Sequence, residues 1–165
     1  MRSVSREKRL NSAVASSAAP QRILAIDYGR KRIGLALSDQ LGVIAQPLGV
    51  LVRKNRLADI KRLREICANQ SVDRIIVGFP VHITGENSDI ADEAARFASR
   101  LTKALHIETE MVDERLTTWE ARRIVPRRNR RTGERPEIDD IAAAVLLRDY
   151  LEHLRETAVS TAARD

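Results

Sequence analysis

Five acidic side chains stand where this sequence could carry out chemistry. Asp27 ends an apolar run, Asp113 and Glu114 end a later one, and Asp139 and Asp140 open an otherwise apolar segment. Carboxylates brought within a few ångströms of one another repel unless they are protonated or bind a cation. All-oxygen ligand sets suit Mg²⁺ or Mn²⁺, and one or two such ions can activate water against a phosphodiester. The acids therefore indicate metal-dependent phosphodiester hydrolysis, provided that the fold brings them together.

Each acid also has an ordinary structural explanation. Asp27 stands two residues before Gly29, so it can be a turn residue or part of a phosphate cradle instead of a metal ligand. One of Asp113 and Glu114 can pair with Arg115. The two acids of the last segment suit the positive end of a helix dipole. The metal interpretation gains weight because three separate elements supply acids.

The apolar pattern alternates strands with helices. Strand-like runs occupy residues 22–27, 32–39, 43–52, 73–80 and 107–113. The order βββαβαβαα predicts an α/β fold with a mixed five-stranded sheet and helices on both faces. The first two strands should form a hairpin, and Pro47 marks the third as an edge strand or a bulge. Ligands bind beyond the carboxyl ends of strands in such sheets, so the first and fifth strands can direct their acids into one crevice.

Helix signals lie between and after these strands. Asn55 can cap a helix with one apolar face, made of Leu57, Ile60, Leu63 and Cys67. A second helix has its own apolar face, made of Ile90, Ala94, Phe97, Leu101 and Leu105. Thr117 and Glu120 form a capping box for a third. The last helix is apolar almost all round from residue 141 to 147, so it should be largely buried.

Length and composition indicate one globular domain. The chain has 165 residues, 43% of them hydrophobic, which suffices for a core. We expect the domain at 22–155, between a basic disordered extension at 1–21 and a flexible tail at 156–165. The single cysteine, Cys67, excludes an internal disulfide and favours a reducing compartment, so we expect a cytoplasmic protein. No apolar run reaches the roughly 18–20 residues of a membrane span, so we expect no membrane partner.

Positive charge is concentrated in one segment. The net charge is +6, and residues 122–135, with seven arginines and one glutamate, account for all of it. A second cluster is opposed nearby by Asp59 and Glu65; its members are Arg53, Lys54, Arg56, Lys61, Arg62 and Arg64. A solvated surface is the ordinary explanation for charged runs. Clustered arginine favours a polyanionic partner, because each neutralised phosphate releases counterions.

Four motifs occur in order along the chain: AIDYGRKRIGLALSD, IIVGFP followed by TGENS, VDERLTTWEA and IDDIAAAVLL. Together they resemble the YqgF family, also called RuvX or Holliday-junction-resolvase-like, over residues 22–152. The resemblance implies a ribonuclease H-like fold and a nuclease that processes the 5′ end of pre-16S rRNA during ribosome biogenesis. The family's relation to RuvC-type resolvases makes a DNA nuclease acting on Holliday junctions the alternative.

The resemblance also implies roles for individual residues. Asp27, Glu114 and Asp139 match the family's three acids and would be both catalytic residues and ligands of Mg²⁺ or Mn²⁺, with Asp140 as the competitor of its neighbour. Structural positions in the family's turns match Gly29, Gly34, Gly78 and Pro80. Phosphate groups of the nucleic acid would be bound by basic side chains, namely Arg30, Lys31, Arg32, Arg127, Arg128, Arg130 and Arg131. The arginine-rich segment with Pro126 departs from the family, whose members often continue a helix there.

Two other functions share some of these features. Sugar kinases and actin-like ATPases also use D-x-G on a first hairpin, but they close two such domains on ATP, and 165 residues leave room for one. A non-catalytic RNA- or ribosome-binding module would keep the fold, although unneeded acids in a cationic cleft would weaken its binding. Aromatic residues are only 3%, which favours recognition of shape or duplex over unpaired bases. We therefore expect rRNA precursor as the partner, with branched DNA as the alternative, ribosomal particles as a further partner, and a monomer or homodimer.

Overall fold

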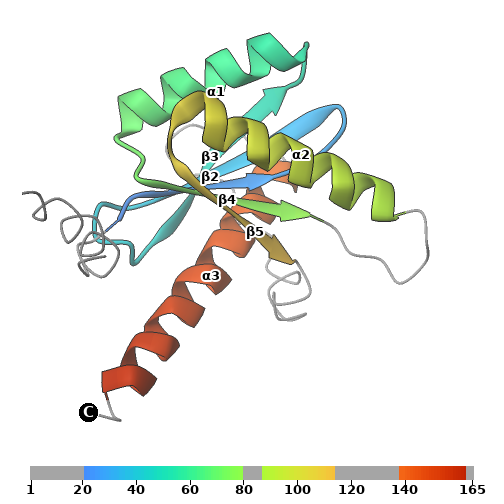
Figure 1. Ribbon diagram of the computed structural model, residues 1–165. Coiled ribbons are helices and arrows are strands. Elements are labelled where there is room, and N and C mark those ends of the chain that lie inside the picture. Colours follow the sequence, from blue (N-terminus) through green and yellow to red (C-terminus); the bar gives the residue numbers. More distant parts are fainter. Residues whose placement is uncertain (1–20, 80–86, 114–137, 163–165) are drawn as a thin grey trace, which may run out of the picture.

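The computed structural model describes residues 21–79, 87–113 and 138–162. The strands in these ranges are β1 (Ile23–Asp27), β2 (Arg32–Ser38), β3 (Ala45–Val52), β4 (Arg74–Phe79) and β5 (Glu108–Asp113). The helices are α1 (Arg56–Gln70), α2 (Asn87–Leu105) and α3 (Ile138–Ala162) (Figure 1). All five predicted strands are confirmed. The helix predicted from Thr117, the basic extension and the arginine-rich segment lie outside the described residues.

The strands form one mixed sheet in the order β3-β2-β1-β4-β5. β1 pairs antiparallel with β2, as the predicted hairpin requires, and parallel with β4, which in turn pairs parallel with β5. β3 pairs antiparallel with β2 at the edge of the sheet, and the register shifts where Ala36 faces Pro47. β1, β3, β4 and β5 therefore point the same way, and their carboxyl ends lie at one end of the sheet.

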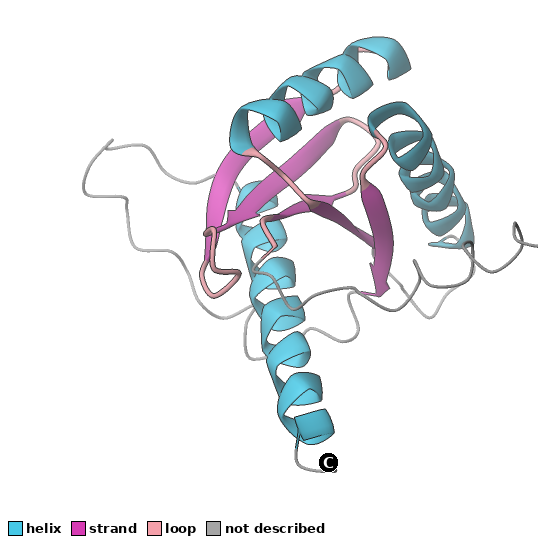
Figure 2. Cartoon of the chain, turned by 60° about the vertical axis from the view of Figure 1, so that its left-hand side comes forward, coloured by secondary structure: helices cyan, strands magenta, loops and turns pink. Residues whose placement is uncertain are grey.

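Helices cover both faces of this sheet, as predicted (Figures 1 and 2). On one face Leu24 and Ile26 of β1 belong to an apolar cluster with side chains of α1 and α2. On the other face Ile23 and Ala25 of β1 belong to a second cluster with side chains of α3. Successive strand residues point to opposite faces, so Asp27 follows Ala25 onto the face that α3 covers.

The buried face of α1 differs from the prediction. The Asn55 side chain caps the helix by accepting a backbone hydrogen bond of 2.9 Å, as predicted. Leu57, however, is 78% exposed, so its assignment to the buried face is wrong. The buried residues are Asp59, Leu63 and Cys67, which repeat every fourth residue, and the acid takes the inward position of the first turn. A buried ion pair, described below, makes this possible.

α3 is longer than the sequence indicates. It continues to Ala162, so the domain boundary expected at residue 155 falls inside the helix, and Figures 1 and 2 show its C-terminal half extending beyond the sheet. Ala143, Leu146 and Leu147 are buried, whereas Ile141 is only partly so. None of the described helices is long and apolar enough to cross a bilayer.

Candidate active site

Asp27 lies between two glycines in the centre of the sheet. It is the last residue of β1, and its cross-strand partners are Gly34 of β2 and Gly78 of β4. Residues directly opposite each other across strands share a face, so neither neighbour places a side chain beside the Asp27 carboxylate on the α3 face. The sequence provides an open notch around this acid.

The start of α3 packs into this notch. A Cβ atom on Gly34 would collide with the backbone carbonyl of Asp139, and one on Gly78 would lie 2.5 Å from Cδ2 of Leu146. Because Gly34 pairs directly with Asp27, the first turn of α3 is brought next to the central acid. Only glycine at position 34 allows the two backbones to approach so closely.

The two acids of α3 have different surroundings. Asp139 forms an ion pair with Arg32, with Nε and Oδ2 3.1 Å apart, and its side chain is 38% exposed. Asp140 is buried, and its Oδ1 has no hydrogen-bond partner among the described residues. Burial raises the pKa of Asp140, and the neighbouring charge of Asp139 raises it further. The start of α3 thus holds two neighbouring acids, of which only Asp139 has an ion-pair partner among the described residues.

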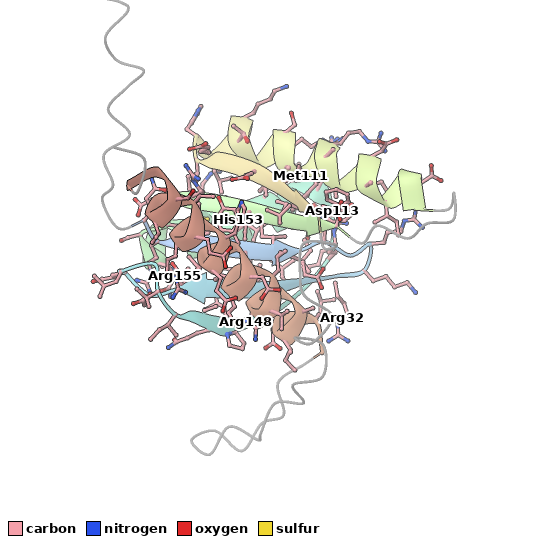
Figure 3. The ribbon with its side chains drawn as sticks, turned by 90° about the horizontal axis from the view of Figure 1, so that it is seen from below. Arg32, Met111, Asp113, Arg148, His153 and Arg155 are labelled. Carbon is pink, nitrogen blue, oxygen red and sulfur yellow. The ribbon has the colours of Figure 1, made fainter. Side chains whose placement is uncertain are left out.

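The acids at the end of β5 reach the same end of the sheet. Asp113 is the last residue of β5 and pairs with Phe79, one residue beyond the Asp27 partner Gly78. Figure 3 shows Arg32 and Asp113 at the same end of the sheet. Glu114, the expected second ligand, follows directly in the chain but lies outside the described residues. The structure therefore brings together two of the three predicted acids, Asp27 and Asp139, and ends β5 at the same edge.

The basic residues after Asp27 are only partly available to a ligand. Arg30 donates hydrogen bonds to Glu93, with Nη2 and Oε1 3.1 Å apart, and this contact lowers the pKa of Glu93. Arg32 pairs with Asp139. Lys31 is exposed, and its ammonium group forms no ion pair with the described residues. The four predicted arginines at 127, 128, 130 and 131, together with Pro80, lie outside the described residues.

Arg53, a partly buried arginine that sequence reasoning did not assign to the site, holds the loop after Asp27. Nη1 of Arg53 donates to the hydroxyl of Tyr28 at 3.0 Å and to the carbonyl of Gly29 at 3.1 Å. Its guanidinium also lies 5.0 Å from the centre of the Tyr28 ring, and its backbone N–H binds the carbonyl of Lys31. The one available sequence signal was an arginine directly after an edge strand, which does not identify a partner 25 residues away.

Gly29 completes this loop. A Cβ atom there would collide with the carbonyl of Arg32, so the turn between β1 and β2 is too tight for a side chain at this position. Three elements, β1, the following loop and α3, therefore meet at Asp27 through glycine contacts. No group of three or more metal-ligating side chains is present among the described residues; the set expected from the sequence includes Glu114, beyond the end of β5.

Comparisons with known proteins agree with this architecture. A protein named "Putative pre-16S rRNA nuclease" from Thermosynechococcus vestitus is 36% identical over 142 residues, covering 86% of this chain and 94% of the relative. One of the same name from Koribacter versatilis is 39% identical, covering 82% of this chain and 90% of the relative. The structure of Thermus thermophilus RuvC with a Holliday junction substrate aligns with a TM-score of 0.61 at 13% identity, over 83% of this chain and 96% of that one.

The structural likeness supports the fold, and the match of the family model supports the family. At 13% identity the RuvC likeness shows the fold alone, and it confirms the ribonuclease H-like architecture expected from the sequence. The model of the RuvX family, described as Holliday junction resolvase, matches residues 21–153. That match spans all of the sheet and the part of α3 that packs on it, so the chain belongs to the RuvX family.

Proposed function

We propose that this protein is an endonuclease that hydrolyses phosphodiester bonds in the 5′-end maturation of pre-16S rRNA. The observation that carries the proposal is the placement of Asp27 in a glycine-lined notch against the acidic start of α3. Such convergence of carboxylates is costly unless it has a use, because like charges in one site oppose ionisation. The relatives' name supplies the substrate class.

The residues present fit a divalent cation. Asp27, Glu114 and Asp139 are the proposed ligands, since carboxylate oxygens are what Mg²⁺ and Mn²⁺ prefer. Asp139 already attracts a cation, the guanidinium of Arg32, and Oδ1 of the neighbouring Asp140 has no hydrogen-bond partner among the described residues; both observations support the proposal. When bound, such an ion stabilises charge on the phosphate and lowers the pKa of an attacking water.

The protein's own groups position the substrate and the acids. β1 holds Asp27 at a strand end that pairs on both sides, so the backbone of this residue has little freedom to move. The hydrogen bonds of Arg53 to Tyr28 and Gly29 fix the adjoining loop, which presents Lys31 to solvent at the same end of the sheet. A lysine or arginine there would contact phosphate groups, which orient a nucleic acid and carry little sequence information.

The test is cleavage of an rRNA precursor with Mg²⁺ or Mn²⁺ by the wild-type protein and by Asp27→Asn. We expect the variant to lose at least about 100-fold in rate, since even residues that only orient metal ligands cost 10- to 100-fold. Addition of EDTA should abolish cleavage by the wild type. Asp92→Asn, an exposed acid of α2, is the matched control. If Asp27→Asn cuts as fast as this control, the assignment is wrong.

A second candidate substrate is four-way DNA, which the family's description as a Holliday junction resolvase favours. Both substrates present the same phosphodiester to the same acids, so the choice depends on surfaces outside the notch. Parallel assays with rRNA precursor and with a four-way DNA junction decide between them. RNA binding that resists EDTA, without cleavage of either substrate in any metal, would instead indicate a non-catalytic binding module.

A further inference from the structure

The second basic cluster of the sequence, residues 53–64, is less neutralised by acids in the folded protein than the sequence indicates. In the sequence Asp59 opposes its positive charges, but in the structure this acid is only 2% exposed. Oδ2 of Asp59 accepts from Nε of Arg53 at 3.1 Å, and Oδ1 accepts from the backbone N–H of Lys54 at 3.0 Å. Both oxygens are thus used inside the fold, and the charge of Asp59 is neutralised by the partly buried Arg53 and not by the exposed cations of the cluster.

The surface of the first half of α1 is therefore strongly basic. Lys54, Arg56 and Lys61 are exposed and form no ion pair with any described residue. Arg62 is exposed as well and pairs with Glu65, the one exposed acid of this helix, at 3.3 Å. Three cations consequently remain without a counter-ion on a short stretch of surface, which produces a positive potential toward solvent.

Two of these cations, Lys54 and Lys61, line a groove at the edge of the sheet. This groove, of about 430 Å³, lies between β3 and α1. Its lining includes Lys54, Lys61 and Arg62, the acid Glu65 that pairs with Arg62, and the strand residues 50–52. Val52 at its mouth pairs with Arg32 across the sheet, and Arg32 contacts Asp139. β3 runs in the same direction as β1, so the groove begins at the end of the sheet that carries Asp27.

We propose that this groove binds the phosphate backbone of the RNA substrate beyond the cleavage site, a role that rests on the nuclease function proposed above. Lysines at its rim would neutralise phosphates while the exposed Val52 contacts ribose. Counterion release supplies the binding free energy of such contacts and makes it depend on salt. Because these groups touch backbone alone, the groove would extend the contact of the enzyme with RNA without selecting a base sequence.

The experiment is a charge reversal, Lys54→Glu with Lys61→Glu, measured by binding. The probe is a fluorescein-labelled RNA that spans the junction between the 5′ leader and mature 16S rRNA, titrated in EDTA over a range of salt concentrations. We expect the slope of log affinity against log salt to fall by about one per lysine, and binding near 0.1 M salt to weaken roughly fivefold to tenfold per lost contact.

The matched control reverses two exposed cations of α2, Arg100 and Lys103. They lie in the last turns of a helix that ends just before β5 begins, at the opposite end of the sheet from Asp27, and the change in net charge is the same. If both double variants weaken RNA binding equally, net charge alone is responsible. If the variant with Lys54 and Lys61 reversed binds RNA as the wild type does, the RNA does not contact the groove. Either result overturns the proposal. Thermal unfolding of both variants verifies that they are folded.

Binding measurements with two other ligands, duplex DNA and an acidic polypeptide, distinguish RNA from other partners of the groove. If the Lys54→Glu, Lys61→Glu variant binds a DNA duplex of the same sequence more weakly but binds RNA as the wild type does, the proposal is overturned. If the variant loses only its binding to poly-L-glutamate, the partner of the groove is an acidic protein, and the proposal is overturned as well. Since EDTA prevents metal-dependent cleavage, the binding result does not depend on catalysis. A wild type that binds RNA through the groove and cuts nothing would contradict the nuclease proposal and leave the groove intact.

Discussion

The guanidinium of Arg53 lies 3.1 Å from the buried carboxylate of Asp59 and, through its other nitrogen, 3.0 Å from the hydroxyl of Tyr28. One side chain thereby links the first turn of α1 to the residue that follows Asp27. It also withdraws one of the two acids of α1 from the basic groove and leaves Glu65, which pairs with Arg62, as the other. The same ion pair thus supports the candidate active site and determines the charge of the surface next to it.

Arg53→Ala should destabilise the fold strongly. Loss of the guanidinium leaves the Asp59 carboxylate buried without its counter-ion, which costs about 3–5 kcal/mol in comparable buried pairs. The free energy of unfolding in urea measures this loss. Arg62→Ala, which breaks the exposed pair with Glu65, is the control and should cost less than about 1 kcal/mol. Similar decreases in the free energy of unfolding for the two variants would show that the Arg53–Asp59 pair stabilises the fold no more than an exposed pair does.

Gly34→Ala should disturb the active site more than Gly78→Ala. A methyl group at position 34 meets the backbone of Asp139, whereas one at position 78 meets the end of the Leu146 side chain, which can rotate. Overpacking of this kind costs about 1–3 kcal/mol, and we expect the larger value and the larger loss of cleavage at position 34. Thermal unfolding and cleavage assays on both variants check the order, and a greater effect at position 78 would contradict it.

Substitution of the two acids of α3 distinguishes the proposed ligand from its neighbour. Asp139→Asn should reduce metal-dependent cleavage by at least about 100-fold, as expected when a direct ligand is lost. Asp140→Asn should retain more activity, and because burial disfavours the charged form and Oδ1 lacks a partner among the described residues, the neutral amide should not lower stability. Binding of Mn²⁺, followed by electron paramagnetic resonance, gives a second readout. Loss of Mn²⁺ affinity in Asp140→Asn alone would assign the ligand to that residue.

Asp39 should make stability depend on pH in the acid range. Its Oδ1 accepts the backbone N–H groups of Ile44 and Val43, at 2.9 and 2.7 Å, and these hydrogen bonds lower the pKa of Asp39. A lowered pKa stabilises the folded state above the ordinary carboxyl pKa of about 3.9, and this contribution is lost as the pH falls through the folded-state value. Urea midpoints of wild type and Asp39→Asn should therefore differ at neutral pH and converge in acid. A gap that is constant with pH would exclude this role.

Cys67 should react slowly with thiol reagents in the folded protein. It is 4% exposed, and burial raises the pKa of its thiol to about 11. Since the thiolate is the reactive form, the native rate with Ellman's reagent at pH 8 should be at least about 100-fold below that in urea. Equal rates in the two conditions would mean that the space beside α1 opens readily.

Local patterns in the sequence were sufficient for the elements and their order. Apolar alternation predicts the strands, Asn55 predicts the start of α1, and Pro47 predicts the edge position of β3, because each signal acts between residues close in the chain. The same reasoning failed for Leu57, which is exposed. It failed because periodicity alone does not reveal that an ion pair lets Asp59 occupy the inward position of that helix.

The sequence by itself determined that acids follow the ends of two strands and open the last helix, and that positive charge gathers in clusters. Only the tertiary structure decided that Asp27 lies in a glycine-lined notch against α3, that Arg32 pairs with Asp139, and that Asp59 is withdrawn from solvent. The physical reason is that these relationships arise where separate elements of the fold pack against one another. Burial and counter-ions depend on packing between elements, which neither composition nor periodicity records.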